Sequence, residues 1–379
     1  MCKKGNFIVI GQLPPPHHGT NVMTSIFLAA LRNLGISYSF VSKEFSVRIS
    51  EVGRFKFTKI LRFVKFLYRL KKQLSLTKSK TLLYFVASGG VGLLADSIAL
   101  FFAKKMRAKY ILYIHGMGYS SKSKNVIEKI LIKNVFSEAE ACITLSEIMK
   151  SDIEGFCRGN IYILRNCISQ EDQQLIEKVK GRYGSFRASG IDRKFRVLFL
   201  SNLLESKGVW TLVQAAKILK NENVEFLMIG DWRDKKFKEK VIRFINQSKL
   251  EGKFVFTGPL YGLEKFEKMA NSDIFVFPSH HPPEAFSLVL LEAMAMGLPV
   301  VATKVGSLSE IVGERNGILI PPKDPLALAE AVKQLISDQR KLTEMRANSY
   351  QVFREKYTFE VYTANLNNIL KNLHLSQEC

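Results

Sequence analysis

Short apolar runs alternate with helical patterns along the whole chain, and this alternation constrains the fold more than any other feature. In the first half, runs typical of strands lie at residues 7–10, 81–86, 110–114, 141–145 and 161–164. In the second half, they lie at residues 196–200, 224–229, 254–256, 274–277 and 300–302. Strands that alternate with helices form a parallel sheet covered on both faces. Because 379 residues are too many for one such domain, the sequence predicts two doubly wound α/β domains in tandem.

A polar stretch with several glycines separates the two halves, from Ser169 to Arg193. We therefore predict an N-terminal Rossmann-like domain at 1–180, a linker at 181–193 and a C-terminal Rossmann-like domain at 194–356. The last segment, 357–379, is expected to form a helix that packs back towards the N-terminal domain. A central cleft between two such domains is the natural place for an active site.

The positive charge of the chain is unevenly distributed. The formal net charge is +22, and residues 1–184 alone hold 29 Lys and Arg against 12 Asp and Glu. A surface of this kind needs an anionic partner, either nucleic acid or an anionic membrane. Much of the excess lies at 53–80, which has ten basic residues and no acidic one.

Within that segment the basic residues recur at helical spacing. Arg62, Lys65, Arg69 and Lys72 are three or four residues apart and so share one helical face. A basic amphipathic helix of this type is typical of membrane-surface binding. The alternative is an ordinary domain helix with a solvated basic face, and the sequence leaves both open.

The stretch from Tyr84 to Ala103 is apolar for long enough to raise a membrane span. Asp96 and three glycines interrupt it, so a strand, a glycine turn and a helix explain it better. No signal peptide is expected, and the five scattered cysteines favour free thiols over disulfides or zinc. These features predict a cytoplasmic protein without a span.

The candidate chemistry lies mostly in the second half. Lys207 and Gly208 stand at a strand-to-helix turn, where an ammonium and backbone N–H groups can bind a phosphate. Two carboxylates, Glu284 and Glu292, are eight residues apart. The spacing predicts that Glu284 precedes a helix and that Glu292 lies about two turns inside it. A carboxylate in so apolar a helix is costly unless it accepts hydrogen bonds, which ribose hydroxyls would supply.

The run from Asp273 to Ala302 resembles the signature of retaining GT-B glycosyltransferases of family 4: Glu, seven residues, Glu, and then Ala-Met-Ala-x-Gly-x-Pro-Val-Val-Ala. The segment 201–209 resembles the phosphate-binding turn of that family, and 316–325 its strand and loop after the signature. The first loop, ending at Gly19, and the His115-Gly116 turn are similar to its acceptor-side elements.

This resemblance implies roles for individual residues. Glu292 would hold the ribose hydroxyls of a nucleotide-sugar donor, and Glu284 the hydroxyls of the donor sugar. Lys207 would neutralise the leaving diphosphate, His115 would approach the transferred sugar, and Gly19 would let backbone come close to sugar or phosphate. The remaining donor-site residues that it implies are Asn202, Ala285, Phe286, Ser287 and Leu288.

Two positions depart from the family pattern. Asn202 stands where the family often has an Arg, and His18-Gly19 stands where many members have Gly-Gly. A UDP-sugar is the favoured donor on family frequency. The implied mechanism is front-face displacement, in which the diphosphate accepts the proton of the incoming hydroxyl. No cofactor or metal is expected, because Lys207 and a helix N-terminus can bear the charge and His280 and His281 have poor metal spacing.

The combined interpretation is a peripheral enzyme at the inner face of the cell membrane. It would transfer a hexosyl residue to a lipid-linked or growing glycan acceptor, in the synthesis of a surface polysaccharide such as O-antigen. The alternatives are another GT-B enzyme, such as a nucleotide-sugar epimerase, and a basic nucleic-acid-binding protein. The last is disfavoured because no recognition motif or stacking platform is evident.

Overall fold

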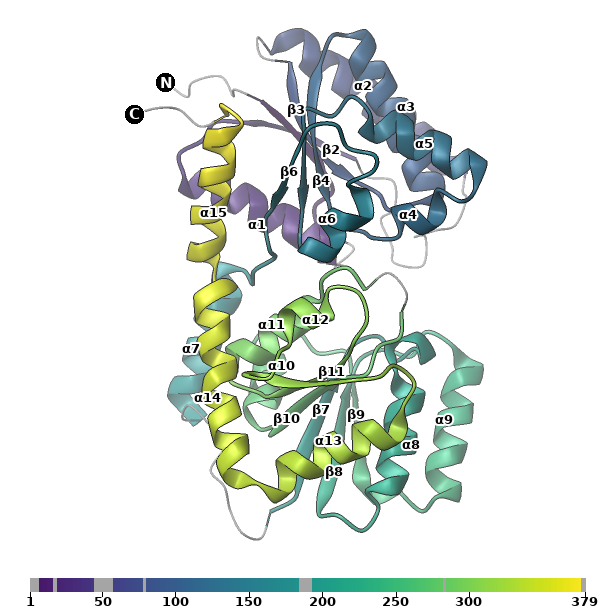
Figure 1. The fold of residues 1–379 in the computed structure, drawn as a ribbon, viewed down its shortest axis with the longest axis vertical. Coiled ribbons are helices and arrows are strands. Elements are labelled where there is room, and N and C mark those ends of the chain that lie inside the picture. Colours follow the sequence, from purple (N-terminus) through teal and green to yellow (C-terminus); the bar gives the residue numbers. More distant parts are fainter. Residues whose placement is uncertain are drawn as a thin grey trace. The chain divides into compact units, whose positions relative to one another are not determined.

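The computed structural model describes residues 7–15, 19–43, 57–77, 80–183, 193–281 and 284–375. The chain folds into two compact α/β units (Figure 1). The first unit consists of Met1–Cys167 and Phe359–Cys379, and the second of Ile168–Thr358. Each unit contains a six-stranded sheet in which every pair of neighbouring strands is parallel. The predicted fold of two Rossmann-like doubly wound halves is confirmed.

The sheet of the first unit has the strand order β2-β1-β3-β4-β5-β6. Its strands are β1 (Ile8–Gly11), β2 (Ser39–Ser42), β3 (Thr81–Val86), β4 (Lys109–Ile114), β5 (Ala141–Thr144) and β6 (Asn160–Ile163). The central strands β3 and β4 are buried almost throughout, as expected for a sheet with helices on both faces. The sequence did not predict β2, an edge strand of which only Val41 is fully buried.

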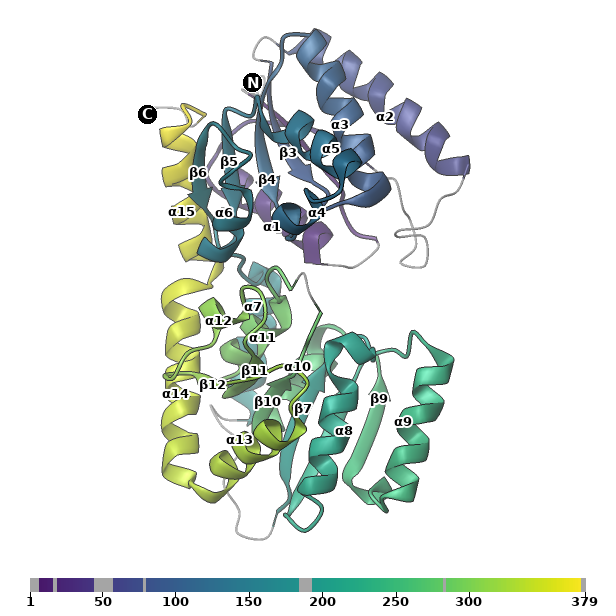
Figure 2. The same cartoon turned by 45° about the vertical axis from the view of Figure 1, so that its right-hand side comes forward.

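The helices of this unit form two layers, because the direction of travel along the sheet reverses after β2 and crossovers are right-handed. One layer contains α1 (Gly19–Asn33) and α15 (Phe359–Asn372), which pack together. In the other layer α2 (Phe57–Leu76), α3 (Gly90–Lys105) and α5 (Val126–Phe136) lie side by side (Figures 1 and 2). The short helices α4 (Tyr119–Lys122) and α6 (Glu147–Ile153) complete the unit.

The C-terminal helix returns to the first unit, as predicted. The hydroxyl groups of Tyr362 on α15 and Tyr113 on β4 lie 3.2 Å apart, and both side chains are buried. Burial raises the pKa of both phenols, so the contact is between neutral hydroxyls. Residues 376–379, which the sequence included in this helix, lie outside the described residues.

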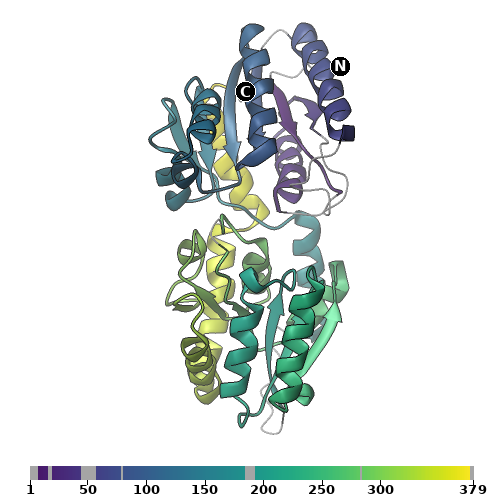
Figure 3. The same ribbon diagram turned by 90° about the vertical axis from the view of Figure 1, so that its right-hand side faces the viewer.

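The sheet of the second unit has the strand order β12-β11-β10-β7-β8-β9. Its strands are β7 (Phe195–Leu200), β8 (Val224–Ile229), β9 (Phe254–Gly258), β10 (Ile274–Phe277), β11 (Val300–Thr303) and β12 (Gly317–Ile320). Its helices are α7 (Gln170–Tyr183), α8 (Val209–Ile218), α9 (Lys235–Gln247), α10 (Gly262–Ala270), α11 (Leu288–Ala295), α12 (Leu308–Ile311), α13 (Pro325–Ser337) and α14 (Gln339–Lys356). The neighbours α8 and α9 are seen best in Figures 2 and 3. One apolar core fills each face of this sheet.

The boundary between the units lies earlier in the chain than the sequence placed it. Helix α7, most of which the sequence assigned to the N-terminal domain, packs against α10 of the second unit. Arg182 near the end of α7 forms an ion pair with Glu267, with a distance of 2.7 Å. The apolar residues Ile176 and Val179 of α7 are buried in the second core. Most of the predicted linker, residues 184–192, lies outside the described residues.

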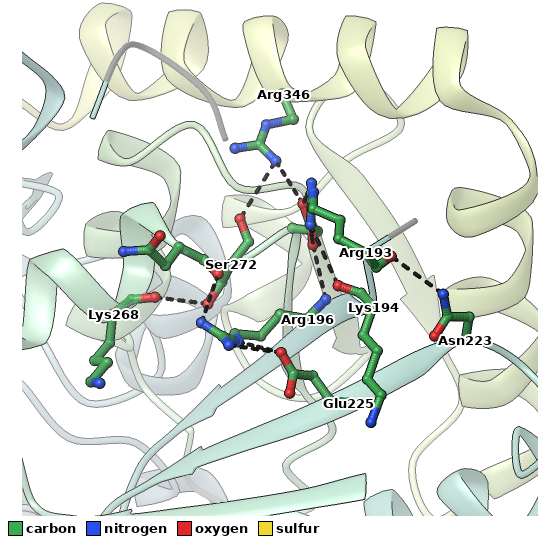
Figure 4. A network of polar contacts seen from close by, with 10 residues as sticks. Arg193, Lys194, Arg196, Asn223, Glu225, Lys268, Ser272 and Arg346 are labelled. Carbon is green, nitrogen blue, oxygen red and sulfur yellow. Dashed lines mark hydrogen bonds and ion pairs between the residues drawn. The ribbon is translucent and has the colours of Figure 1, made fainter. Parts of the chain in front are cut away.

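At the amino edge of the second sheet, a buried carboxylate is surrounded by arginines (Figure 4). Asp273 directly precedes β10 and is fully buried. Its two oxygens accept hydrogen bonds of 2.7 Å each from the guanidinium of Arg193, and one accepts a third from the backbone N–H of Arg196. Arg346 of α14 adds a charge at 3.6 Å. This network joins the start of β7, the start of β10 and α14.

The structure bears on two predictions for the first unit, the apolar stretch from Tyr84 to Ala103 and the cysteines. The apolar stretch from Tyr84 to Ala103 divides into the end of β3, a glycine turn and α3, and no helix among the described residues is long and apolar enough to cross a membrane. Cys142 and Cys157, scattered in the sequence, come together with their sulfur atoms 2.6 Å apart. Cys2 and Cys379 lie outside the described residues.

Candidate functional site

The site of the second unit lies where the connections of its sheet change direction. Strands β7 and β10 are neighbours, but β7 leads to β8 on one side and β10 leads to β11 on the other. In open parallel sheets, ligands bind beyond the carboxyl ends of the strands at such a point. Lys207 follows β7, and Ser279 and Glu284 follow β10. The topology therefore brings Lys207 and Glu284, 77 positions apart, into contact at the carboxyl edge of the sheet.

Lys207 and Glu284 form the central ion pair of this site. The distance from Lys207 Nζ to Glu284 Oε2 is 2.6 Å, and the side chains are 19% and 8% exposed. The hydroxyl of Ser279 donates a second hydrogen bond to the same oxygen, at 2.9 Å. A buried pair is tolerated only when further hydrogen bonds offset the loss of hydration, which Ser279 helps to do. The arrangement holds a cation and a carboxylate in fixed positions at the sheet edge.

Two glycines allow the loops around this pair to come together. Gly208 has a φ of +85°, and a Cβ at this position would meet the carbonyl oxygen of Pro278 at 2.0 Å. Gly306 has a φ of +52°, and its Cβ would lie 2.1 Å from the carbonyl oxygen of Glu284. The same carbonyl accepts a hydrogen bond from Ser307 N at 3.1 Å. The backbone on both sides of the ion pair thus requires glycine, and a side chain there would displace Glu284.

Helix α11 begins at Leu288, so residues 285–287 form a short half-buried loop between Glu284 and the helix. The side chain of Ser287 at the N-cap makes no capping hydrogen bond. The first N–H groups of a helix are without partners inside the helix, and together with its dipole they favour an anion. Ser287 and Leu288 lie at this N-terminus, whereas Ala285 and Phe286 precede it in the loop. A role of these four residues in donor binding stays a prediction.

Glu292 lies one turn inside α11, not two, because the helix starts later than the spacing predicted. Its Oε2 forms an ion pair with Nζ of Lys265 on α10, at a distance of 3.0 Å. Burial raises the pKa of Glu292, and the charge of Lys265 opposes this shift only in part. A carboxylate in this state is stabilised by any hydroxyl that donates to it.

Sequence reasoning missed Arg233, which lies beside Asn202. Arg233 Nε donates to Asn202 Oδ1 at 3.1 Å, and its Nη1 is 3.5 Å from Asp231. The parallel pairing of β7 with β8 brings the two loops together, and Leu203 bridges to Trp232 beyond the strands. The sequence has Asn202 where the family often has an arginine. In the structure, Arg233 from the loop after β8 lies beside that asparagine. Only the strand register could have revealed this neighbour.

Gly19 and His115 belong to the first unit, whereas the other predicted site residues belong to the second. Gly19 is the first residue of α1, and a Cβ there would meet nothing within 4 Å. His115 directly follows β4 and stacks on Phe85, with ring centroids 5.3 Å apart. Its Nε2 is buried without a hydrogen-bond partner, and burial lowers its pKa to about 3. The imidazole is therefore neutral at physiological pH, and His18 lies outside the described residues.

No group of three or more His, Cys, Asp or Glu side chains with metal-binding geometry occurs among the described residues. His280 and His281 follow β10, and burial lowers the pKa of both, with Lys207 adding to the shift of His281. They are adjacent in the loop beside the ion pair rather than part of a ligand cluster. Pro283, part of the predicted signature, lies outside the described residues.

The sequence pattern of the family Glycosyl transferases group 1 matches residues 185–352, which contain the whole second sheet, the ion pair and α11. The second unit of the chain is thus similar to this family. Its members are glycosyltransferases that retain the anomeric configuration of the sugar. The match ends before α15, so the family pattern covers the second unit and not the first.

Similarity to individual glycosyltransferases extends over more of the chain. An uncharacterized glycosyltransferase of Methanocaldococcus jannaschii is 29% identical over 282 residues, 70% of each chain. A putative teichuronic acid biosynthesis glycosyltransferase of Bacillus subtilis is 24% identical over 65% of this chain and 60% of its own. The crystal structure of Anabaena HepE in complex with UDP and glucose has a TM-score of 0.70 and 18% identity, and it covers 97% of this chain and 99% of its own. This last likeness shows that the chain has the GT-B fold.

Proposed function

We propose that this protein is a glycosyltransferase that moves a hexosyl residue from a UDP-sugar to a lipid-linked or growing glycan acceptor, with the donor bound at the carboxyl edge of the second sheet. The observation that carries the proposal is Glu292, a largely buried carboxylate that is paired with Lys265 at 3.0 Å and still has a raised pKa. Neighbouring ribose hydroxyls offer two donors to one carboxylate. Their binding would offset the part of the desolvation that Lys265 leaves uncompensated.

The diphosphate of the donor would lie beside Lys207 and the N-terminus of α11. Both present positive charge to the same crevice, and Arg233 extends it towards β8. As the bond from the sugar C1 to the diphosphate oxygen breaks, negative charge grows on that oxygen. Lys207 would stabilise this charge, which is the main electrostatic requirement of the transition state. The same oxygen would then take the proton of the acceptor hydroxyl as that hydroxyl bonds to C1 from the same face.

Glu284 is proposed to bind hydroxyls of the donor sugar rather than to act as a nucleophile. Its Oε2 is already bonded to Lys207 and Ser279, which holds the carboxylate in one orientation and lowers its nucleophilicity. Its second oxygen would accept from the sugar. From the first unit, the neutral imidazole of His115 is suited to a hydrogen bond with an uncharged sugar, and the open space at Gly19 is suited to close approach of a ligand.

Several observations support the donor, the acceptor class and the location that we propose. HepE, which shares the fold, binds UDP and glucose, and the relative from Bacillus subtilis is named for teichuronic acid biosynthesis. The basic helix α2 exposes Lys65, Arg69 and Lys72, and Arg62 is half-buried. A lipid-linked acceptor on the anionic inner face of the cell membrane would place the enzyme where this helix can bind. Synthesis of a surface polysaccharide, such as capsule or O-antigen, is the process that we infer.

Thermal unfolding with UDP, GDP and ADP tests the donor site. A ligand at a hundredfold over its dissociation constant stabilises the folded state by about 2.7 kcal/mol. We expect UDP to raise the melting temperature of the wild type and to lose this effect in Glu292→Ala. The matched control is Glu225→Ala, which removes a carboxylate of the same sheet on β8 and should retain the UDP shift. An equal UDP shift in wild type and Glu292→Ala would show that Glu292 does not bind the donor. A shift with GDP alone would show that the donor nucleotide is not UDP.

A further inference from the structure

Exposed apolar side chains are concentrated on the outer layer of the first unit. Of the seventeen large apolar residues that are exposed in the described parts of the chain, twelve lie on α2, α3 and α5. They are Ile60, Leu61, Val64, Tyr68 and Leu76 on α2, Val91, Leu94, Ile98 and Phe101 on α3, and Val126, Ile127 and Ile130 on α5. The three helices are neighbours (Figures 1 and 2), so these side chains belong to one surface. Contiguous apolar surface of this kind marks an interaction site.

The apolar residues on the outer side of α3 are not needed for packing of the core. The inner face of α3 buries a charged residue, Asp96, which accepts hydrogen bonds of 2.7 Å from both Tyr84 and Ala87 N and pairs with Lys43 at 3.0 Å. Its outer apolar residues, from Val91 to Phe101, are spaced by three and four and form one stripe. A helix that is apolar on its outer side is typical of a membrane or a permanent interface. Because of this apolar stripe, the sequence from Tyr84 to Ala103 is almost as apolar as a membrane-spanning segment.

Helix α2 has two apolar stripes, and the fold uses only one. Phe66, Leu70 and Leu74 recur at a spacing of four and are buried. Leu61 and Val64 point elsewhere and are 65% and 57% exposed. If α2 were an ordinary domain helix with a solvated basic face, the residues between its basic side chains would be polar. The structure instead shows Val64 and Tyr68 exposed beside Lys65 and Arg69.

The charge of the surface identifies its partner. The three helices carry ten Lys and Arg against two acidic residues, and one of those two, Asp96, is buried. A second copy of the chain would bring the same positive charge face to face. Nucleic acid would need aromatic platforms, but most of the exposed apolar residues are aliphatic. Aliphatic side chains between basic ones match an anionic lipid surface, with hydrocarbon below and phosphates around it.

We propose that α2, α3 and α5 together form a docking surface for an anionic bilayer. The outer residues of α3 and α5 enter the boundary between headgroups and acyl chains, and the basic residues of α2 bind lipid phosphates. This extends the membrane location proposed above from charge attraction at α2 to insertion by three helices. It rests on that location only in part, because vesicle binding is measured without donor or acceptor.

Co-sedimentation with vesicles tests the proposal on the full chain. The vesicles contain phosphatidylcholine alone or with about a third phosphatidylglycerol, at low and at high salt. The variant Leu94→Gln/Ile98→Gln/Phe101→Gln changes no charge and is expected to weaken binding to anionic vesicles by about tenfold or more, since bound apolar area sets the affinity. The matched control Ile218→Gln/Leu326→Gln replaces exposed apolar residues of the second unit and should bind like the wild type.

The salt dependence separates insertion from adsorption. At high salt, surface charges are screened, so we expect the wild type to retain partial binding while the α3 variant loses it entirely. Equal binding of variant and wild type, or complete release of the wild type by salt, would overturn the proposal. So would a wild-type dimer that ignores vesicles and becomes monomeric in the α3 variant. An unchanged melting temperature and an unchanged UDP shift in the variant would confirm an intact fold and donor site, whatever the vesicle result.

Discussion

The two edges of the second sheet both bury a carboxylate, but they treat it in opposite ways. At the amino edge, Asp273 is bonded on both oxygens by Arg193 and also accepts from Arg196 N. At the carboxyl edge, Glu292 is paired with a single lysine, Lys265, at 3.0 Å, and burial raises its pKa despite that charge. All the charge of Asp273 is thus used within the fold, whereas Glu292 keeps capacity to accept further hydrogen bonds. This difference supports our proposal that the carboxyl edge, which also holds the Lys207–Glu284 pair, binds the donor.

The largest expected effect is on stability, at the amino edge. Asp273→Ala leaves Arg193 and Arg346 without their shared anion inside the protein. Breaking one partner of a buried pair costs about 3–5 kcal/mol. Urea unfolding should show this loss, and any protein that remains folded should still bind UDP. A variant as stable as the wild type would contradict a stabilising role for Asp273.

The next effect is on catalysis, at the carboxyl edge. Lys207→Gln keeps a polar side chain beside Glu284 but removes the charge at the proposed diphosphate position. Loss of one group that stabilises transition-state charge lowers kcat by about 10²–10³. Initial rates with a UDP-sugar test this loss of kcat. Measuring them in the presence of a chelator also tests whether the reaction is independent of metal. A rate within twofold of the wild type would remove Lys207 from the mechanism.

A smaller effect is expected from pH, because burial raises the pKa of Glu292 above its ordinary value of 4.5. Between that value and the folded pKa, the native state holds a proton that the unfolded state has lost. Stability therefore falls as pH rises through this window. UDP binding should show the reverse trend and weaken below the folded pKa, because a protonated carboxyl accepts fewer hydrogen bonds.

The comparison variant for this pH dependence is Glu292→Gln. It should lack both trends, so the difference between its unfolding free energy and that of the wild type isolates the contribution of Glu292. Parallel curves for the two proteins across pH 4–7 would contradict a buried, ionisable donor-binding carboxylate.

The smallest expected effect is that of Arg233, which is exposed at the margin of the site. Arg233→Ala should weaken UDP binding by roughly fivefold, about the contribution of one hydrogen bond to a charged group in partly screened surroundings. Binding of UMP should change less, because UMP lacks the second phosphate. Arg243→Ala, on the exposed side of α9, is the control for a general loss of positive charge. Equal losses for UDP and UMP would show that Arg233 does not contact the diphosphate.

Much of the fold was predictable because its signals are local. The continuous apolar runs of β3, β4, β7 and β8 reflect burial on both faces of a sheet, which depends only on residue type. Strand β2 was missed because its burial comes from neighbours rather than from its own composition. The start of α11 was misplaced because the loop 284–287 and the helix have similar apolar content, and only the backbone distinguishes them.

The two α/β halves and the family signature could be predicted from the sequence, because both follow from patterns along the chain, and the same signature singled out Lys207, Glu284 and Glu292 as candidate site residues. The tertiary structure decided which of these residues meet. The parallel strands bring Lys207 to Glu284 and Arg233 to Asn202, and α10 brings Lys265 to Glu292. It also decided which apolar residues of α2 and α3 the core uses and which stay outside. Periodicity shows that a helix has an apolar face, but only packing shows whether that face is covered.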